Sequence, residues 1–255
     1  MKRIVVKVGS AVLSENNHIA QERLEALVDF IARLKKRYEV ILVSSGAVAA
    51  GYTQLKLDKK LLSNKQALAS IGQPILMNKY RKLFEVHNLL SSQILVTAAN
   101  FTTPEEAQRA KDTIETLLVH NVIPIINEND ATATEELVVG DNDQLSAYAT
   151  HYFGARLLVI LSDIDAYYDK DPRTYDDAKV RSRIHNIEPR ELEMEASPNH
   201  GFATGGIVTK LKAADFLLKR NGAMLLASGF DLSDAYSFLL DDEHSGGSYF
   251  KSKEA

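Results

Sequence analysis

The sequence predicts an α/β protein with a mainly parallel central sheet. Short apolar runs rich in β-branched residues alternate with segments whose apolar residues recur at helical spacing. Some of these runs are almost continuously apolar, which is typical of strands covered by helices on both faces. Strand and helix patterns that alternate in this way indicate parallel pairing, because parallel strands need a crossover connection between them.

The N-terminal part of the chain begins with a strand, a helix and a second strand. The apolar run 4–8 predicts the first strand, and the run 40–43 predicts the second. Between them, apolar residues at helical spacing predict a helix over 21–36. Its apolar stripe consists of Leu24, Leu27, Val28 and Ile31.

The middle of the chain contains a second helix and a third strand. The segment Thr103-Pro104-Glu105-Glu106 resembles a capping box with proline in the first turn, which predicts a helix from there to about 118. The run 122–126 is strand-like, but it includes Pro124, which favours a place at the edge of the sheet.

The C-terminal part adds two strands and a helix. The runs 157–161 and 223–227 predict strands buried on both faces. Thr204 is a candidate N-cap for the helix between them. The apolar stripe of that helix consists of Ile207, Leu211, Ala214 and Leu218. The tail 241–255 is polar and contains glycine, so we expect it to be partly loose.

Composition excludes several classes of function. The 255 residues suffice for one large domain or two small ones, and a net charge of −4 without a basic cluster argues against nucleic-acid binding. The absence of cysteine excludes disulfides, zinc–thiolate sites and cysteine nucleophiles. The first apolar run is too short for a signal peptide, and no stretch has the length of a membrane span. We therefore expect a soluble, cytoplasmic protein without a nucleic-acid or membrane partner.

The segments that follow the strands carry the functional hypotheses, because ligands of parallel sheets bind at the carboxyl ends of strands. Lys7 is followed by Gly9 and Ser10, so an ammonium group and backbone N–H groups can meet a phosphate; a tight turn is the alternative. The small residues of 44–51, including Gly46, favour an anion at a helix N-terminus or simply close packing. The chain has neither a Walker A loop nor a dinucleotide fingerprint.

Acidic and amide residues gather in two further segments, 127–130 and 140–143. Such groups can bind the ammonium of an amino acid, or a metal through oxygen ligands. Asn, Asp and Gly are also common in solvated turns, so a purely structural role is the alternative.

Two segments of the C-terminal part complete the set. Ser162 and Asp163 can bond to a purine or its ribose, with Tyr167 and Tyr168 flanking the base, although tyrosine is also common as surface coverage. Lys210 falls in the early turns of the predicted helix, where the helix dipole disfavours a cation. An anion nearby would offset this cost, whereas a simple surface lysine is the alternative.

These segments, in this order, resemble the amino acid kinase family. The resemblance rests on 5–10, 43–48, Gly72-Gln73, 127–130, 140–143 and 204–214. It implies an αβα sandwich in a single domain over 1–255, with an acceptor-binding lobe over about 1–150 and a nucleotide-binding lobe over about 151–255. Most bacterial relatives also carry a C-terminal PUA domain, which we expect this chain to lack.

The resemblance also implies roles for individual residues. Lys7 and Lys210 would hold the phosphoryl group, and Asp143 would orient both. The acceptor-binding positions would be Ser44, Gly46, Asn127, Asp130, Asp141 and Asn142. The nucleotide-binding positions would be Lys7, Gly9, Ser10, Ser162, Asp163, Thr204, Gly205, Gly206, Ile207, Val208, Thr209 and Lys210. No residue is expected to serve as a metal ligand, since Mg²⁺ would be held mainly by the ATP phosphates.

Within the family, 127–130 and 140–143 favour the members that phosphorylate the side-chain carboxylate of free L-glutamate with ATP and Mg²⁺, the first step of proline biosynthesis. An unblocked α-amino group needs a carboxylate partner, which these segments offer. Kinases of N-acetylglutamate, aspartate or a nucleoside monophosphate are alternatives, as is a non-catalytic nucleotide or amino-acid sensor. The intact Lys7, Asp143 and Lys210 argue against the sensor.

Two local departures from the family pattern accompany the resemblance. Ser162 stands where many relatives have threonine, so the hydroxyl is kept, and Ala131-Thr132 replaces the usual Thr-Val after the first acidic segment. The resemblance further suggests a homodimer or homotetramer, feedback inhibition by proline, and hand-off of the product to glutamyl phosphate reductase.

Overall fold

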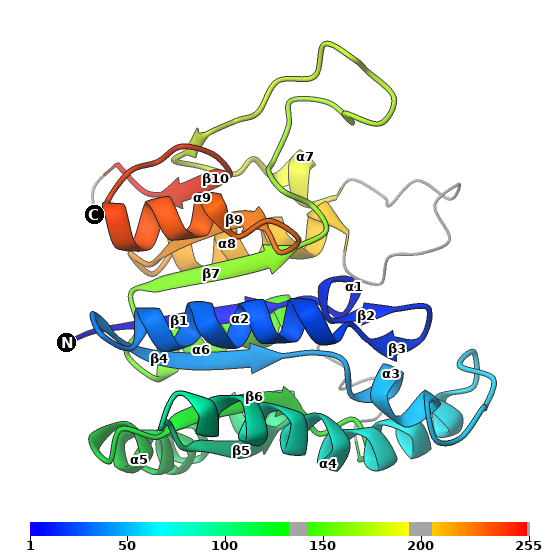
Figure 1. Cartoon of the computed structure of the whole chain (residues 1–255). Coiled ribbons are helices and arrows are strands. Elements are labelled where there is room, and N and C mark those ends of the chain that lie inside the picture. The colour runs from blue at the N-terminus through cyan, green and yellow to red at the C-terminus, as the bar shows by residue number, and fades with distance from the viewer. Residues whose placement is uncertain (102, 133–141, 194–205, 254–255) are drawn as a thin grey trace.

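The computed structural model describes residues 1–101, 103–132, 142–193 and 206–253. Within these ranges the main sheet has eight strands in the order β5-β6-β4-β1-β7-β9-β10-β8. The neighbouring strands are parallel except for β9 and β10. Helices cover both faces of the sheet (Figure 1). The predicted αβα sandwich with a mainly parallel sheet is confirmed.

The described elements have the following bounds. The strands of the main sheet are β1 (Lys2–Val8), β4 (Tyr38–Ser44), β5 (Ser91–Val96), β6 (Ile123–Glu128), β7 (Leu157–Ser162), β8 (Arg183–Ile184), β9 (Ala223–Ser228) and β10 (Ser248–Lys251), and a small hairpin joins β2 (Ser14–Glu15) to β3 (His18–Ile19). The α-helices are α1 (Ser10–Leu13), α2 (Gln21–Leu34), α3 (Ala47–Tyr52), α4 (Leu62–Val86), α5 (Pro104–Val119), α6 (Asn142–Tyr152), α7 (Pro189–Leu192), α8 (Ile207–Leu218) and α9 (Ser233–Tyr236). Short helical turns of other types are η1 (Ala98–Phe101) and η2 (Ser237–Asp241).

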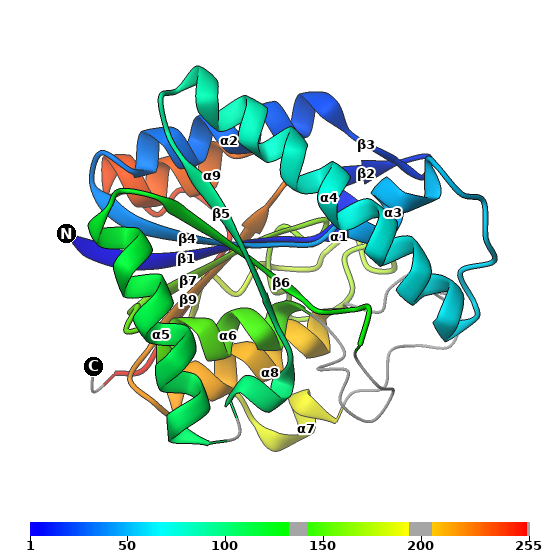
Figure 2. The ribbon, with the colours of Figure 1, turned by 90° about the horizontal axis from the view of Figure 1, so that it is seen from below.

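Strand β1 lies near the middle of the sheet and contributes to two separate cores. It pairs with β4 on one side and with β7 on the other. Val6 and Val8 pack in the core beneath α2, α4 and α9, whereas Val5 packs in the core with α5, α6 and α8. Figure 2 shows these two groups of helices on opposite sides of the strands. Because side chains alternate along a strand, Lys7 points to the same face as Val5, toward α6 and α8.

The run that contains Pro124 is a strand, β6, and it is an internal strand of the sheet rather than an edge strand. Strand β6 lies between β5 and β4. Pro124 stands opposite Ser92 of β5, and pairing with β4 begins only at Ile125. On the β4 side, Pro124 stands before the ladder begins. The N–H group that proline lacks therefore costs no hydrogen bond to β4 there.

The predicted helix caps had different outcomes. The Thr103 side chain accepts a hydrogen bond of 3.3 Å from the Glu106 N–H at the start of α5, as predicted. The N-cap of α8 is Gly206, which makes no side-chain cap bond, and not Thr204, which lies outside the described residues. That cap was assigned to the wrong residue because α8 begins only at Ile207.

The chain beyond 241 is more ordered than its composition predicts. Strand β10 pairs antiparallel with β9, and Phe250 is fully buried beneath the sheet. Ser248 is also buried, and its hydroxyl accepts the backbone N–H of Tyr167 at 2.8 Å. One buried aromatic ring and this sheet pairing hold the segment in place despite its polar neighbours.

Glycines allow α3 and α4 to pack backbone against backbone. A side chain on Gly51 would place its Cβ 1.9 Å from the Leu68 carbonyl oxygen, and one on Gly72 would lie 1.8 Å from that of Ala47. Neither distance is possible for a real Cβ. For Gly51, close packing is therefore sufficient to explain the small residue.

Candidate active site

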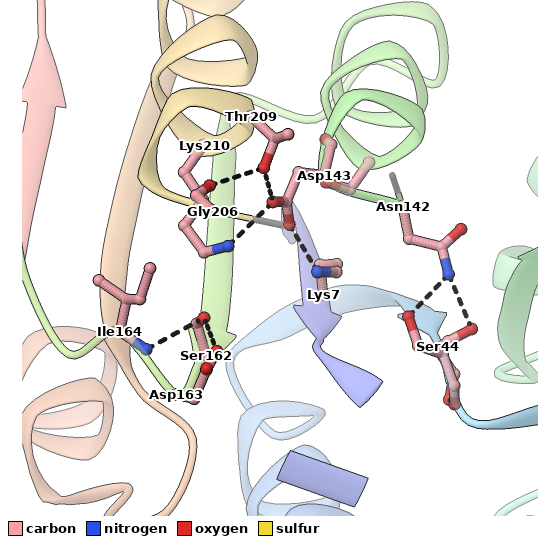
Figure 3. Close-up of polar contacts among 12 residues, drawn as sticks. Lys7, Ser44, Asn142, Asp143, Ser162, Asp163, Ile164, Gly206, Thr209 and Lys210 are labelled. Atoms are coloured by element: carbon pink, nitrogen blue, oxygen red, sulfur yellow. Dashed lines mark hydrogen bonds and ion pairs between the residues drawn. The ribbon is translucent and has the colours of Figure 1, made fainter. Parts of the chain in front are cut away.

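The carboxyl ends of the central strands bring the predicted segments to one edge of the sheet. Val8, at the end of β1, is in register with Ser44 of β4 and Leu161 of β7. The first turns of α6 and α8 lie at the same edge, where Asp143 and Lys210 meet (Figure 3). This is where the fold class predicts a ligand.

Asp143 joins two buried lysines. Its Oδ1 lies 2.5 Å from Nζ of Lys7, and its Oδ2 lies 3.1 Å from Nζ of Lys210. The exposed fractions are 3% for Lys7, 2% for Lys210 and 0% for Asp143. Thr209 Oγ1 lies 2.9 Å from the same Oδ2 and 2.8 Å from the Gly206 carbonyl oxygen. Because buried charges are costly unless paired, this carboxylate fixes the position of both ammonium groups.

Each member of the trio comes from a different element. Lys7 is held by the central strand, and Asp143 lies in the first turn of α6, where the helix dipole favours a carboxylate. Lys210 lies in the first turns of α8, where the dipole disfavours a cation. The nearby anion expected for Lys210 is present in the structure as the Asp143 carboxylate, so Lys210 is not a simple surface lysine.

A chain of side-chain amides lines the neighbouring strand ends. The Asn142 amide Nδ2 donates to Ser45 Oγ at 2.8 Å and to Asn127 Oδ1 at 3.0 Å. It also lies 3.4 Å from the Ser44 carbonyl oxygen. Asn127 in turn donates to Gln73 Oε1 on α4 at 2.9 Å. Ser44, Asn127 and Asn142, which sequence reasoning assigned to acceptor binding, are thus brought together.

Ser44 has a buried partner that sequence reasoning missed. The hydroxyl oxygens of Ser44 and Tyr80 lie 2.8 Å apart, and Tyr80 is fully buried in α4. Burial raises the pKa of Tyr80, so the phenol stays protonated. Ser45 and Gln73 also join the site without having been assigned to it, although Gln73 belonged to a motif that supported the resemblance. No local signal marks Tyr80, because its position depends on how α4 packs.

Asp130 follows β6 by two residues and is half-buried at this edge. Burial raises the pKa of its carboxyl above the ordinary value. Gly46 adopts a left-handed conformation with φ of 108° at the start of α3, which explains glycine there through backbone geometry. Three predicted positions, Asp141, Thr204 and Gly205, lie outside the described residues.

The ends of β1 and β7 form the other half of the site. The Gly9 N–H donates to the Leu161 carbonyl at 3.0 Å, so this N–H serves the fold. Ser162 accepts the Ile164 N–H at 3.2 Å and lies 3.0 Å from the Asp163 carboxylate. Among the described residues, no atom lies within 4 Å of the place that a Cβ on Gly206 would take.

Ser10, Ile207 and Val208 frame this second half. Ser10 begins α1 directly after Gly9, and its carbonyl accepts a hydrogen bond of 2.7 Å from the Ser14 hydroxyl. Ile207 and Val208 form the first turn of α8 and are partly buried. They lie next to Thr209 and Lys210 in the chain, so the described part of the predicted nucleotide segment is contiguous with the lysine–aspartate trio.

Tyr167 does not flank an open space. Its ring is 8% exposed, stacks on Phe250 at a centroid distance of 6.4 Å, and its hydroxyl donates to Glu191 at 2.5 Å. Burial, together with the bond to Glu191, raises the pKa of Tyr167 to about 12. The hypothesis that this ring flanks a purine is therefore replaced by a packing role. Tyr168 makes its own contact, with the Asp165 carboxylate at 3.1 Å.

The donor set bears on how a metal ion can be bound. Among the described residues, no group of three or more His, Asp or Glu side chains is arranged to hold a metal ion. Mg²⁺ in phosphoryl-transfer sites is usually bound by substrate phosphates and only one or two carboxylates. A magnesium ion that arrives bound to its nucleotide would not need such a group of side chains. In the same part of the chain, no helix is both long and apolar enough to cross a bilayer.

Two buried lysines on one carboxylate lie at the carboxyl edge of a parallel sheet, the edge at which such folds bind their ligands. The chain belongs to the amino acid kinase family, whose model matches residues 2–227. The resemblance inferred from the sequence is confirmed. The chain is similar to the glutamate 5-kinase of Wolinella succinogenes, with 56% identity over 98% of this chain and 98% of that relative. It is likewise similar to the glutamate 5-kinase of Leishmania donovani, with 56% identity over 99% of this chain and 96% of that relative.

Solved structures agree on the fold. The isopentenyl phosphate kinase of T. acidophilum in its product complex superposes with a TM-score of 0.66 over 98% of this chain and 100% of that one. Sequence identity in that comparison is 12%, so the likeness concerns the fold alone. The architecture is thus shared with enzymes whose acceptors differ.

Proposed function

We propose that the protein transfers the γ-phosphoryl group of ATP to the side-chain carboxylate of free L-glutamate, the first step of proline biosynthesis. The observation that carries the proposal is the pair of ammonium groups, Lys7 and Lys210, fixed on the two oxygens of Asp143 at the carboxyl edge of the sheet. The similarity to glutamate 5-kinases over nearly the whole chain supports glutamate as the acceptor.

The acceptor needs no general base. A side-chain carboxylate is already ionised at neutral pH, so it can attack the γ-phosphorus directly. A carboxylate oxygen forms the new P–O bond, the bond between the γ-phosphorus and the β–γ bridging oxygen breaks, and ADP leaves with the electron pair. No proton has to move in this step. The protein's task is to bring two anions together, which is mainly a matter of position and charge.

Lys7 and Lys210 carry out that task in this proposal. They reach the site from a strand and a helix, so their ammonium groups approach the transferring phosphoryl group from different elements. Asp143 is a positioning residue, because it holds each lysine through a separate oxygen. Preorganised charges in a buried site stabilise the transition state without having to reorient during the reaction.

ATP and Mg²⁺ occupy the half of the site formed by the ends of β1 and β7 and the start of α8. No described residue fills the Cβ position of Gly206, which suits close approach of a phosphate, and Ser162 and Asp163 offer polar groups to the nucleoside. Mg²⁺ bound with the nucleotide would neutralise part of the charge of the phosphates. Residues of about 151–255 form the nucleotide-binding lobe in this assignment.

Glutamate occupies the half formed by the ends of β4 and β6, within the acceptor-binding lobe of about 1–150. Ser44, Asn127 and Asn142 provide hydrogen-bonding groups there. The Asp130 carboxylate is available for the ammonium of the amino acid. Gly46 shapes the loop through its backbone conformation.

Several wider properties belong to the same proposal. We expect a homodimer or homotetramer in the cytoplasm, inhibition by proline, and transfer of the acyl phosphate to glutamyl phosphate reductase. An acyl phosphate is a reactive product, which favours its direct transfer to the enzyme that consumes it. Size-exclusion chromatography with light scattering tests the oligomeric state, and a proline titration tests the inhibition.

The decisive test of the function is an acceptor panel with ATP and Mg²⁺ in which the acyl phosphate is trapped as a hydroxamate. We expect hydroxamate with glutamate and none with N-acetylglutamate or aspartate. For UMP, whose product UDP forms no hydroxamate, release of ADP is measured instead, and we expect none. Product with one of these other acceptors would replace the proposed substrate. No product with any acceptor, together with ATP that binds and stays intact, would indicate a sensor.

A further inference from the structure

The orientation of the amide chain at the acceptor half is fixed by a backbone group. The Glu128 N–H, which can only donate, lies 2.9 Å from the side-chain oxygen of Asn127. That contact identifies which atom of the Asn127 amide is oxygen. Its nitrogen must then be the atom that donates to Gln73 Oε1 at 2.9 Å. The oxygen of Gln73 is therefore occupied.

The row of hydrogen-bonded amides ends at Gln73 and at Asn142. Each of these two side chains has one polar atom without a hydrogen-bond partner among the described residues. Gln73 is 7% exposed, and its Nε2 has no hydrogen-bond partner among the described residues. At the other end, Asn142 uses its nitrogen on Ser45 and Asn127, and its Oδ1 has no partner in the same part of the chain. One buried donor and one buried acceptor are thus unpaired. Groups of this kind are rare in folded proteins and call for an explanation such as a ligand.

A free α-amino acid matches these two groups chemically. Its α-carboxylate accepts hydrogen bonds, and its ammonium group donates them, from substituents of a single carbon atom. A buried amide donor forms a strong hydrogen bond with a carboxylate, because one partner carries a charge. Both amides are held by their other hydrogen bonds, so they are preorganised for such a ligand.

The position of Gln73 indicates which end of the substrate it meets. Asn142 is the chain neighbour of Asp143, which holds the two lysines. Gln73 lies two hydrogen bonds further along the amide chain, on α4. It is thus on the side away from phosphoryl transfer, where the α-carbon of a glutamate bound by its γ-carboxylate would lie.

We propose that Gln73 determines acceptor specificity by donating its Nε2–H to the α-carboxylate of the substrate, with Asn142 Oδ1 accepting from the ammonium group. The inference rests on the proposed function and adds to it a residue that recognises the α-carboxylate of the amino acid. Kinases of acceptors without an α-carboxylate have no use for this donor. Gln73 therefore contributes to the choice of a free amino acid as substrate.

The test compares Gln73→Met, which keeps the length of the side chain and removes the donor, with wild type. Gln108→Met is the matched control, since Gln108 is exposed on α5 and bonds only locally to Asp112. For each protein, kcat and KM are measured with glutamate and ATP. Inhibition constants against glutamate are measured for glutarate, which has both carboxylates but no ammonium, and for 4-aminobutyrate, which lacks the α-carboxylate.

We expect Gln73→Met to raise the KM for glutamate and the inhibition constant of glutarate about tenfold or more, as for loss of a hydrogen bond to a charged group. The inhibition constant of 4-aminobutyrate, kcat and the KM for ATP should change less than about twofold, and Gln108→Met should leave all constants unchanged. An unchanged constant for glutarate would overturn the proposal, as would equal losses for glutarate and 4-aminobutyrate. If 4-aminobutyrate does not inhibit the wild type, the change in the inhibition constant of glutarate alone decides whether the proposal holds.

A second variant covers the case in which Gln73→Met does not fold. Gln73→Glu keeps the size of the side chain but opposes the substrate carboxylate with a like charge, so we expect an even larger rise in the KM for glutamate. A KM equal to that of wild type would contradict the role of Gln73. Failure of the proposed function itself has a different signature, because the wild-type protein would then form no hydroxamate from glutamate.

Discussion

Nζ of Lys7 lies 2.5 Å from Oδ1 of Asp143, although the two residues are 136 positions apart in the chain. The lysine comes from a central strand and the aspartate from a helix N-terminus, so the contact exists only when β1 and α6 are packed together. The other oxygen of the same carboxylate meets Lys210 of α8. A change at Asp143 is therefore expected to affect stability as well as catalysis.

Asp143→Asn should lower the free energy of unfolding by about 3–5 kcal/mol, since breaking a buried ion pair leaves buried charge without its partner. Urea denaturation measures this loss. The control Asp215→Asn removes a helical pair with the largely exposed Lys219 and should cost at most about 1 kcal/mol. The double variant Asp143→Asn/Lys210→Met should recover part of the stability. Equal stability of Asp143→Asn and wild type would contradict this account of the trio.

Tyr80→Phe should raise the KM for glutamate several-fold while leaving the KM for ATP unchanged, because the Ser44 hydroxyl loses the buried phenol that orients it. The free energy of unfolding should fall by about 1 kcal/mol for the lost hydrogen bond. Tyr38→Phe removes a comparable bond to the Leu239 carbonyl, at the opposite end of β4 from Ser44. That control should lose similar stability without a change in KM. Identical kinetics of both variants would reduce Tyr80 to a packing residue.

Asp130 should make the stability of the free protein depend on pH. Burial raises its folded-state pKa, so its stabilising contribution is complete below the unfolded pKa of about 3.9 and is lost as the pH rises through the folded value. Asp130→Asn should consequently be more stable than wild type at neutral pH, and the difference should vanish as the pH falls toward about 4. Denaturation curves at several pH values measure this. A difference that grew on acidification would have the wrong sign.

Gly206 should tolerate a side chain in the free protein but not in the nucleotide complex. Its backbone is extended, and no atom of the described residues lies within 4 Å of its Cβ position. Gly206→Val should thus keep the thermal midpoint of unfolding and raise the KM for ATP. Gly72→Ala provides the contrast, since its Cβ would lie 1.8 Å from the Ala47 carbonyl oxygen, and it should unfold at a much lower temperature. Unchanged kinetics of Gly206→Val would exclude close phosphate approach at that position.

Local patterns in the sequence predict the buried strands well, because β1, β4, β7 and β9 are continuous apolar runs. They do not predict α4, in which Pro74 and many polar residues obscure the helical period, or the polar edge strand β5. Helix α6 was not predicted either, since its first turn coincides with an acidic segment whose composition is typical of a loop. These elements are defined by packing against the rest of the protein rather than by their own pattern.

The residues of the candidate site also fall into two groups, those that the sequence predicts and those that only the structure reveals. Lys7, Asp143 and Lys210 follow from strand-end position and the family resemblance, and the structure brings them together. Tyr80 carries no signal in the sequence, because a tyrosine in a helix becomes part of a site only through tertiary contacts. Ser45 lies in the recognised motif 43–48, but its bond to Asn142 becomes evident only in the structure. Gln73 stood in a recognised motif, but its unpaired nitrogen becomes evident only once the hydrogen bonds of Asn127 are known.

The central claim is that two lysines stabilise the transferring phosphoryl group, and turnover of Lys210→Met tests it most directly. Lys212→Met is the control, as Lys212 is exposed two residues further along the same helix. With glutamate, ATP and Mg²⁺ at saturation, we expect Lys210→Met to lose about 10²–10³ in kcat. Its thermal midpoint should stay close to that of wild type, since methionine fills the space and Asp143 keeps Lys7 and Thr209. The control should turn over normally. Near-normal turnover of folded Lys210→Met would contradict the claim.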